Sequence, residues 1–546
     1  MRVRRRRGIP QVPAEDPDFS RALESMTAPE LRAFVRGVLD ELDPDARTAI
    51  VDALIARAVK GRAGWKPSRP AQRIVDDAKS FAEAARVVGY ADPADVSEHL
   101  RLGGKALLAG DHATARGVFE ALLLPIAMAD IDLGEHELVA EVLTVDAHTC
   151  VAQYVTSVYT TTPVSQRADA VLSAMEQVRG VSSLLNPIKE MEDVSAGTLP
   201  DLGAFLPLWA TRLGRFRPAK DEWETDHERW LREAVFRMDG VAGLERIARK
   251  TKRPHACLAW CEALADAGRW PEALRAFDAA AALVGKSHWR GQLLDGSALA
   301  AQQLGRTDVP RRLEAAWRGA PTLPRLLRWI ASDGYTVASL RAKAKKALPR
   351  CPKAAGRQLG LLRVLVGELN AAADALSKAP GLGWSSEDHP GHLVFPLLAV
   401  LLANGTTRKV SDTLLAELES TCRDLLAAFS DEDADAKPTL ATPSIVALIH
   451  DARPSIKMAD ADRDVAITAM RVAAEKRVEG ILGNSRRRHY GHAALLVASC
   501  LAFAPKGREA ELSTWYMELR QRHLRRSAFR QELTRAFAGL GVAPLT

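Results

Sequence analysis

Apolar side chains recur every three or four positions along most of this chain, which is the period of an amphipathic helix. The pattern is clearest in residues 255–284, where Gly268 separates two periodic runs. The apolar positions of the two runs are Trp260, Cys261, Leu264, Ala273, Phe277 and Ala280. Because glycine commonly ends helices, the pattern predicts two short antiparallel helices joined by a glycine turn.

The order of large and small side chains in this hairpin resembles a tetratricopeptide repeat, in which small residues let two helices approach closely and an aromatic side chain fills the gap. Similar orders recur in residues 102–122, in residues 359–379 and around Gly305, although Pro310 replaces the expected small residue in the last of these. We therefore predict an all-α fold, an α-solenoid of irregular tetratricopeptide-like helical hairpins with a C-terminal helical cap.

Breaks in the helical pattern divide the chain into segments. Glycine and proline interrupt it at residues 61–70, four prolines at 186–221, and an acidic, proline-containing stretch at 430–443. The expected segments are a basic disordered tail at 1–18, an N-terminal helical hairpin at 19–60, a helical domain with a tetratricopeptide-like hairpin at 71–185, a helical-repeat solenoid at 186–429 and a basic helical domain at 444–546.

The composition agrees with a helical protein. Of the 546 residues, 47% are hydrophobic and only 5% are aromatic, a balance rich in alanine and leucine that favours helices over sheets. No run approaches the roughly 18 apolar residues that cross a bilayer, and the six cysteines form no CxxC pair. We therefore expect a cytoplasmic protein with no membrane partner and no disulfide framework.

The net charge of +7 permits attraction to nucleic acid. Basic side chains gather in the N-terminal tail and in a predicted C-terminal helix. The residues considered for nucleic-acid contacts are Arg4, Arg5, Arg6, Arg7, Arg520, Arg525 and Arg526. Few aromatic residues stand between these arginines, and the sequence has no RRM, KH or helix-turn-helix signature, so a nucleic-acid-associated accessory protein is the alternative hypothesis.

Two regions together resemble the long all-helical region that follows the SWIM zinc finger in many bacterial proteins. The resemblance rests on ALLAGDHATARGVFEALLLPI at residues 106–126, GEHELVAEVLTVDAHTCVAQY at 134–154, HYGHAALLVASCLAF at 489–503 and the spacing of Tyr490, Trp515, Leu519, Arg520 and Arg526. The signature CxCx(n)CxH is absent, so the zinc of that finger is not implied here. The resemblance implies a tetratricopeptide-like scaffold that acts through protein contacts.

Two motifs match catalytic or nucleotide-binding patterns only in part. Residues 285–287 read GKS, as at the end of a P-loop, but Ala280 stands where the first glycine belongs and no strand is predicted before it. His136 and Glu137 begin HExxH, but Ala140 occupies the second histidine position. Neither motif therefore predicts a site.

Cysteines and histidines also give no predicted site. Cys257 and Cys261 share a helical face, but no nearby pair completes four zinc ligands, so we expect them to pack in the core. His489, His492 and His523 lie among arginines, where a structural or solvent-facing role is expected. We accordingly predict no catalytic residue, no metal ligand and no cofactor, and do not predict an enzyme. An enzyme with no recognisable motif remains a third hypothesis.

The predicted function is that of a non-catalytic helical-repeat scaffold or adaptor that binds a protein partner, with a regulatory or defence role. Stacked hairpins would leave inner helix faces to select the partner by shape and charge. The residues expected on such a face are Arg101, Lys105, His255 and Arg357. The identity of the partner and the oligomeric state are not predicted.

Overall fold

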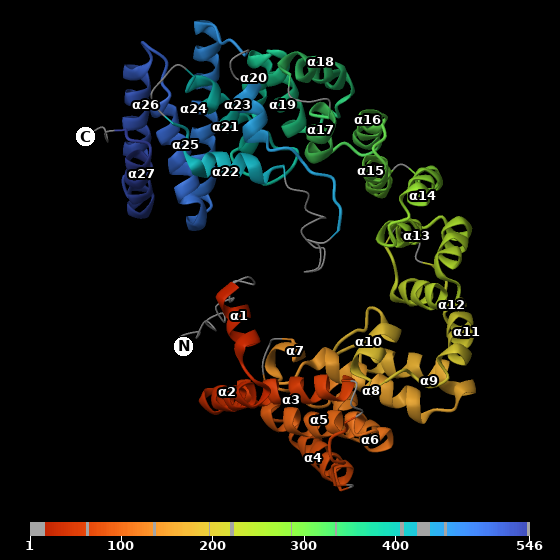
Figure 1. Cartoon of the computed structure of the whole chain (residues 1–546). Helices are drawn as coiled ribbons and strands as arrows, with labels where there is room; N and C mark the ends of the chain where they lie inside the picture. The colour runs from red at the N-terminus through yellow and green to blue at the C-terminus, as the bar shows by residue number, and fades with distance from the viewer. Residues whose placement is uncertain are drawn as a thin grey trace. The chain divides into compact units, whose positions relative to one another are not determined.

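The computed structural model describes residues 17–61, 65–71, 73–134, 138–195, 197–218, 223–285, 287–332, 336–404, 409–422, 437–452 and 456–542. Within these ranges the chain forms helices and turns, and its single β-bridge, between Tyr90 and Asp132, belongs to no strand. The predicted all-α solenoid of irregular helical hairpins is confirmed (Figure 1).

The chain divides into two compact units, Met1–Gly243 and Leu244–Thr546. The predicted segment 186–429 therefore contributes to both. Helix α12, Asp226–Thr251, crosses the boundary and is interrupted at Gly240, where φ is 58° and ψ is −144°. This left-handed backbone conformation is readily adopted by glycine, which has no Cβ.

The first unit is built from the N-terminal part of α12 and eleven helices before it. Those helices are α1 (Pro17–Ser25), α2 (Ala28–Glu41), α3 (Pro44–Lys60), α4 (Ile74–Val88), α5 (Pro93–Leu108), α6 (His112–Ala127), α7 (Val139–Val142), α8 (Ala147–Thr161), α9 (Val164–Gln177), α10 (Pro187–Val194) and α11 (Leu202–Leu213). Buried aromatic rings join α8 to α11, with Tyr159 meeting Phe205 edge-on at 4.9 Å and Phe205 stacking on Trp209 at 5.7 Å.

Helices α5 and α6 form the hairpin predicted for residues 102–122. The turn between them contains Gly110, whose φ is 83°. Ala115 and Phe119 of α6 are fully buried. A Cβ at Gly103 of α5 would lie 3.3 Å from the Phe119 ring, so the small residue does allow the close approach that the pattern predicted.

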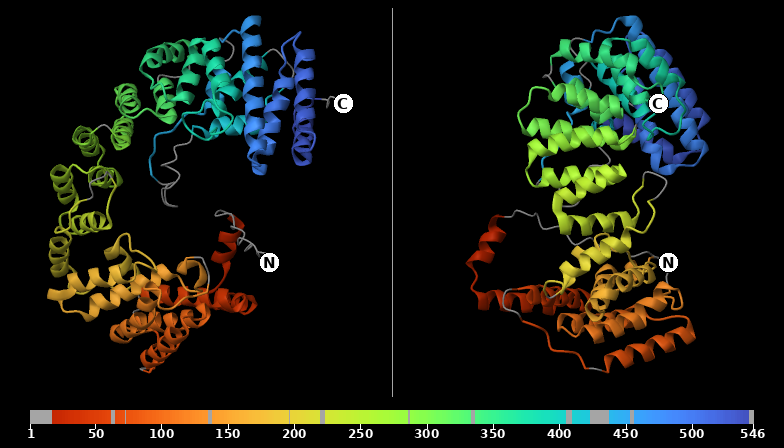
Figure 2. Two further views of the ribbon diagram at one scale, coloured as in Figure 1. Left: turned by 180° about the vertical axis from the view of Figure 1, so that it is seen from behind. Right: turned by 90° about the vertical axis from the view of Figure 1, so that its right-hand side faces the viewer.

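The second unit continues with further helices and short 3-10 turns. Its elements are α13 (Pro254–Asp266), α14 (Trp270–Leu283), α15 (His288–Gln303), α16 (Val309–Gly319), α17 (Leu323–Ile330), α18 (Val337–Ala347), η1 (Leu348–Arg350), α19 (Gly356–Val366), α20 (Leu369–Lys378), α21 (Gly391–Leu402), α22 (Asp412–Ser420), α23 (Ile445–Ala452), α24 (Asp460–Gly483), η5 (Arg487–His489), α25 (Tyr490–Ala502), α26 (Glu509–Arg522) and α27 (Ser527–Gly539). Figure 2 shows α13–α16 as successive neighbouring helices.

Three predicted hairpins lie in this unit, as α13–α14, α15–α16 and α19–α20. Their turns contain Gly268, Gly305 and Gly367, with φ of 67°, 63° and 89°. Ala273 and Phe277 are buried, as the hairpin prediction required. Pro310 stands in the first turn of α16, where a missing N–H breaks no helical hydrogen bond.

The C-terminal cap consists of α24–α27. Tyr490 of α25 meets Phe529 of α27 edge-on at 5.9 Å, and Tyr516 of α26 meets Phe537 at 5.0 Å. These rings belong to one apolar core that begins at Ala298, so the cap packs on the repeats of its own unit. All six cysteines of the chain are free and buried. Among the described helices, none has both the length and the apolarity to cross a membrane.

Candidate functional site

The predicted partner-binding residues of the first unit lie on α5. The Arg101 guanidinium is 3.2 Å from Asp52 Oδ2 of α3 and donates to Thr144 Oγ1 at 3.0 Å. This side chain is only 15% exposed, so it mainly holds α3 and the residues before α8 against α5. Lys105, one turn further along α5, is exposed.

The predicted partner-binding residues of the second unit, His255 and Arg357, are less exposed than Lys105. The His255 ring packs against Trp289 with centroids 4.3 Å apart. Arg357 is buried, and its Nη2 donates to the carbonyl oxygens of Trp384 and Ser385 at 3.0 and 2.9 Å. Arg357 therefore fixes the segment before α21 and does not present its charge on a surface. The partner-binding role of the four residues stays a prediction.

The arginines considered for nucleic-acid contacts are only partly described, since Arg4, Arg5, Arg6 and Arg7 lie outside the described residues. Arg525 is exposed, and Arg526 Nη2 donates to the carbonyl of Leu482 at 3.4 Å. Arg520 is half-buried. Their neighbour Arg522 forms ion pairs with Glu475 and Glu479 of α24. The basic helix α26 is thus partly neutralised by the acidic side chains of α24.

The sequence motifs have clear structural contexts where they are described. The core position predicted for Cys257 and Cys261 is confirmed, and burial raises the pKa of both thiols, that of Cys257 to about 11. Ala280, the first-glycine position of the P-loop pattern, lies in helix α14, and Lys286 lies outside the described residues. His136 and Glu137 lie outside the described residues.

Three ionisable side chains from different helices of the second unit converge on one point. His392 stands in the first turn of α21, Glu417 in the last turn of α22 and His492 in the first turn of α25. Glu417 Oε2 is 3.4 Å from His392 Nδ1 and 3.3 Å from His492 Nε2. These three atoms lie within 4.8 Å of one another and are buried, and among the described residues they have no well-aligned hydrogen bond to any other group.

Burial and mutual contacts shift the pKa values of Glu417 and His492. Burial alone would raise the pKa of the Glu417 carboxyl, but the two close imidazoles outweigh burial and lower it to about 2. Burial lowers the pKa of His492. A metal ion would bind the carboxylate and the neutral forms of the imidazoles.

Trp384 covers the two imidazoles. Its ring meets His392 at 5.5 Å and His492 at 5.2 Å, both edge-on. A Cβ at residue 391 would lie 2.5 Å from the Trp384 ring, so the glycine before His392 is needed for this packing. On the other side, Arg477 Nε lies 3.4 Å from His492 Nδ1. The cluster is thus enclosed by an indole and a guanidinium.

Sequence reasoning missed this cluster, although a signal was present. Residues 389–392 read HPGH and residues 489–492 read HYGH, so the same His-x-Gly-His pattern introduces α21 and α25. The last histidine of each copy is a member of the cluster. His492 was expected to be structural or solvent-facing, and its side chain is 10% exposed and points at Glu417.

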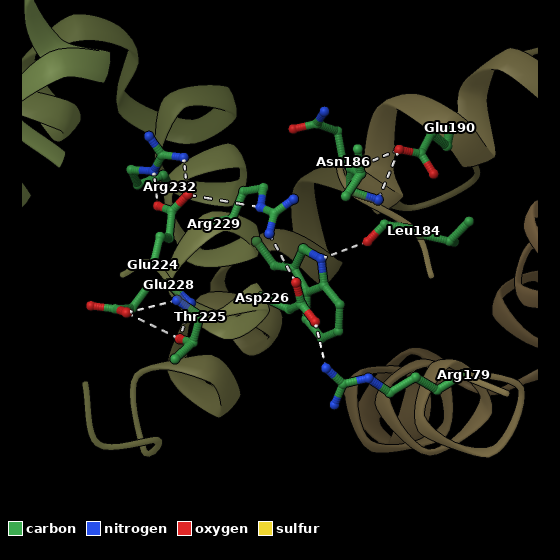
Figure 3. Close-up of polar contacts among 12 residues, drawn as sticks. Arg179, Leu184, Asn186, Glu190, Glu224, Thr225, Asp226, Glu228, Arg229 and Arg232 are labelled. Carbon is green, nitrogen blue, oxygen red and sulfur yellow. Dashed lines mark hydrogen bonds and ion pairs between the residues drawn. The ribbon is translucent and has the colours of Figure 1, made fainter. Parts of the chain in front are cut away.

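A second polar cluster lies in the first unit, where α12 begins (Figure 3). Asp226 accepts hydrogen bonds from Arg179 at 3.2 Å and from Arg229 at 2.9 Å. Trp230 Nε1 donates to the carbonyl oxygen of Leu184 at 2.9 Å. These bonds attach α12 to the segment that joins α9 to α10.

Beside these contacts, His148 bridges a serine and a carboxylate. Its Nδ1 is 3.0 Å from Ser182 Oγ and its Nε2 is 3.1 Å from Glu190 Oε2, an order that resembles a nucleophile, a base and an orienting acid. The adjoining cavity has a volume of only about 40 Å³, whereas ligand pockets hold roughly 300–1,000 Å³. The contacts of His148 join α8 to α10 and to the segment before it.

Glu233 of α12 caps the N-terminus of α10. Its carboxylate accepts the backbone N–H of Lys189 at 2.8 Å and of Ile188 at 3.2 Å. Burial raises the pKa of this carboxyl from 4.5 to about 7, although the two N–H donors oppose the shift. Between these two pH values the native state retains a proton that the unfolded state releases, so stability falls as the pH rises through this window.

We therefore expect Glu233→Gln to remove a pH dependence from the first unit. Raising the pH from 4.5 to 8 should destabilise α10 by roughly 3 kcal/mol in the wild type through this group, and the uncharged variant should lack this contribution. Hydrogen exchange of α10 peptides, corrected for intrinsic rates, measures the difference. The same pH dependence in both proteins would refute the assignment.

No protein-family model matches the chain, and no curated protein matches it significantly. Among solved structures, it is similar to an IFIT1 monomeric mutant with Gppp-AAAA at 11% sequence identity, over 86% of this chain and 99% of that chain, with a TM-score of 0.17. With so low a TM-score, the fold class rests on the helices of the chain itself. The resemblance to the region that follows SWIM zinc fingers stays a prediction.

Proposed function

We propose that the chain is a non-catalytic helical-repeat scaffold and that the α2–α3 hairpin of its first unit binds an amphipathic helix of a protein partner. The proposal is carried by one observation, which is that this hairpin leaves its apolar side chains uncovered. The exposed side chains are Leu31, Phe34, Val38, Ile50, Val51 and Leu54, and we call them the apolar stripe.

The apolar stripe has the periodicity of a face that is normally covered. Leu31, Phe34 and Val38 follow one another on one side of α2, which has no buried residue. Phe34 is 56% exposed and Leu54 is 47% exposed. Contiguous apolar surface on a folded protein commonly marks an interaction site, and two neighbouring helices with such a face suit a third amphipathic helix.

The hairpin is attached to the rest of its unit by other side chains. The buried Val59 and the Asp52–Arg101 ion pair join α3 to the unit, while Arg47 of α3 donates to the carbonyl oxygens of Leu39 and Asp40 of α2. The apolar stripe is therefore not needed for these attachments. Because these side chains are already about half exposed, a polar substitution there should cost about 1 kcal/mol, less than a substitution in the core.

The charged alternative receives less support from the described residues. Arg522 pairs with two carboxylates, and Arg508, which begins α26, pairs with Asp464 and Glu511. Of the described arginines considered for nucleic-acid contacts, Arg525 and Arg526 are the exposed ones that this alternative would use. The uncovered side chains of the apolar stripe are better suited to a protein.

The proposal predicts that Phe34→Ser with Leu54→Ser weakens partner binding about tenfold or more, because apolar anchors carry much of the energy of such interfaces. The partner would be recovered from the native host by photo-cross-linking at residue 38, identified and then titrated against purified chain. A matched control, Arg36→Ser with Arg57→Ser, changes two exposed polar positions of the same helices.

The outcomes separate the hypotheses. Unchanged affinity in the apolar double variant would refute the proposal, as would light scattering that shows the stripe to be occupied by a second copy of the chain. Loss of binding in the arginine control alone would favour electrostatic capture. Circular dichroism of each variant confirms that the helices remain formed.

A further inference from the structure

We propose that His392, Glu417 and His492 bind one divalent transition-metal ion in the second unit, with Zn²⁺ the best match to this ligand set. Two imidazole nitrogens and one carboxylate oxygen are a ligand combination that Zn²⁺ takes in proteins. The inference is independent of the proposed function, which concerns the first unit.

The spacing of the ligand atoms fits such an ion. Zinc ligands lie roughly 2.0–2.2 Å from the metal, which places neighbouring ligand atoms of a tetrahedral site about 3.3 Å apart. Glu417 Oε2 is 3.4 Å from His392 Nδ1 and 3.3 Å from His492 Nε2. The two histidine nitrogens lie within 4.8 Å of each other, and small ring rotations bring them to the same spacing.

The burial of these three polar atoms also supports a bound metal ion. Buried polar atoms almost always have a partner, because an unpaired one loses its hydration without compensation. Here three buried polar atoms from three helices face one another at 3.3 and 3.4 Å, and among the described residues they have no well-aligned hydrogen bond to any other group. One ion at the point where they converge would satisfy all three.

Metal binding also sets a condition on Arg477. A neutral histidine that binds an ion through Nε2 carries its proton on Nδ1, and Arg477 Nε faces that atom of His492 at 3.4 Å. The guanidinium must therefore turn away from His492 when the ion binds. Its Nη1 already donates to the carbonyl oxygen of Gly381 at 3.2 Å, and its Cζ lies 5.4 Å from the Trp384 ring centroid, so it keeps other partners.

The ion would connect helices that are far apart in the sequence. Its ligands are His392 of α21, Glu417 of α22 and His492 of α25. Three protein ligands leave a fourth position of a tetrahedral ion for water or for a group from another molecule. The expected consequence for this chain is stabilisation of the second unit, because an ion that binds only the folded state favours that state.

The test uses the full chain purified without a polyhistidine tag, stripped with a chelator, loaded with ZnCl₂ and dialysed. We expect elemental analysis to find one zinc per chain and zinc to raise the melting temperature. Co²⁺ in place of zinc should give the visible absorption of a four-coordinate ion. Wild-type protein that retains no zinc and shows no melting shift would overturn the proposal.

Variants locate the ion. His392→Ala and His492→Ala should weaken zinc binding by at least about 100-fold in competition with a chromophoric chelator, and Glu417→Gln tests the carboxylate with nearly unchanged shape, in case a histidine variant fails to fold. The control is His450→Ala, whose side chain is 80% exposed in the same unit. Zinc affinity unchanged in Glu417→Gln, or reduced equally in His450→Ala, would overturn the assignment.

Discussion

Phe277→Ala is expected to lower the free energy of unfolding of the second unit by about 3–5 kcal/mol. Phe277 is 5% exposed between α14 and the next helix, and its ring occupies the space above Gly296 of α15. A Cβ at residue 296 would overlap the ring, so the ring fills the space between α14 and the backbone of α15, and its removal leaves a cavity there. Chemical denaturation measures the lost free energy of unfolding, and hydrogen exchange of peptides from α14 and α15 shows that the loss is located there.

Gly296→Ala provides the matching test of this contact. Alone, it should destabilise the unit by about 1–3 kcal/mol, because the added methyl group meets the Phe277 ring. In the Phe277→Ala background the same substitution should cost much less, since the ring has been removed. Costs that simply add in the double variant would show that the two residues do not meet and that the hairpin packing is wrongly assigned.

Asp295→Ala is the second substitution with a large expected effect, also about 3–5 kcal/mol. Asp295 of α15 lies 2.7 Å from Arg325 Nε and 3.7 Å from Arg328 Nη1 of α17. The two arginine side chains are only 7% and 9% exposed. Without the carboxylate, the buried Arg325 guanidinium loses its ion pair and remains close to the positive charge of Arg328.

The same denaturation series measures this loss. The control is Asp374→Ala, which removes an ion pair with Lys378 on the surface of α20, where the aspartate side chain is 56% exposed. Exposed pairs of this kind contribute about 0.3–0.5 kcal/mol. Similar costs for the two aspartates would show that the charges around Asp295 are hydrated and would contradict the buried triad.

The helical hairpins could be predicted because their determinants are local. Ala273, Phe277 and Gly268 are close in sequence, and the period of apolar residues together with the glycine turn specifies both helices of the pair. The same local pattern predicts that Leu31, Phe34 and Val38 share a face of α2. It does not show whether another helix covers that face, because covering depends on elements distant in sequence.

The histidine–glutamate cluster shows this limit most clearly. Glu417 lies among ordinary acidic residues of α22, and nothing local relates it to His392 or His492. Only the repeated His-x-Gly-His pattern linked the two histidines. Arg357 was expected on a surface because a long basic side chain is usually exposed. Here it is buried, and two backbone carbonyl oxygens accept its hydrogen bonds.

The burial of all six cysteines has a practical consequence for spectroscopy. Thiol reagents attack the thiolate, and burial raises the pKa of these side chains, for example to about 12 at Cys150. A cysteine introduced at an exposed position such as residue 34 should therefore react with a maleimide dye well before the native thiols do. The native cysteines of the folded chain therefore need not be removed before labelling. A fluorophore attached to the apolar stripe would report on the binding of a partner there.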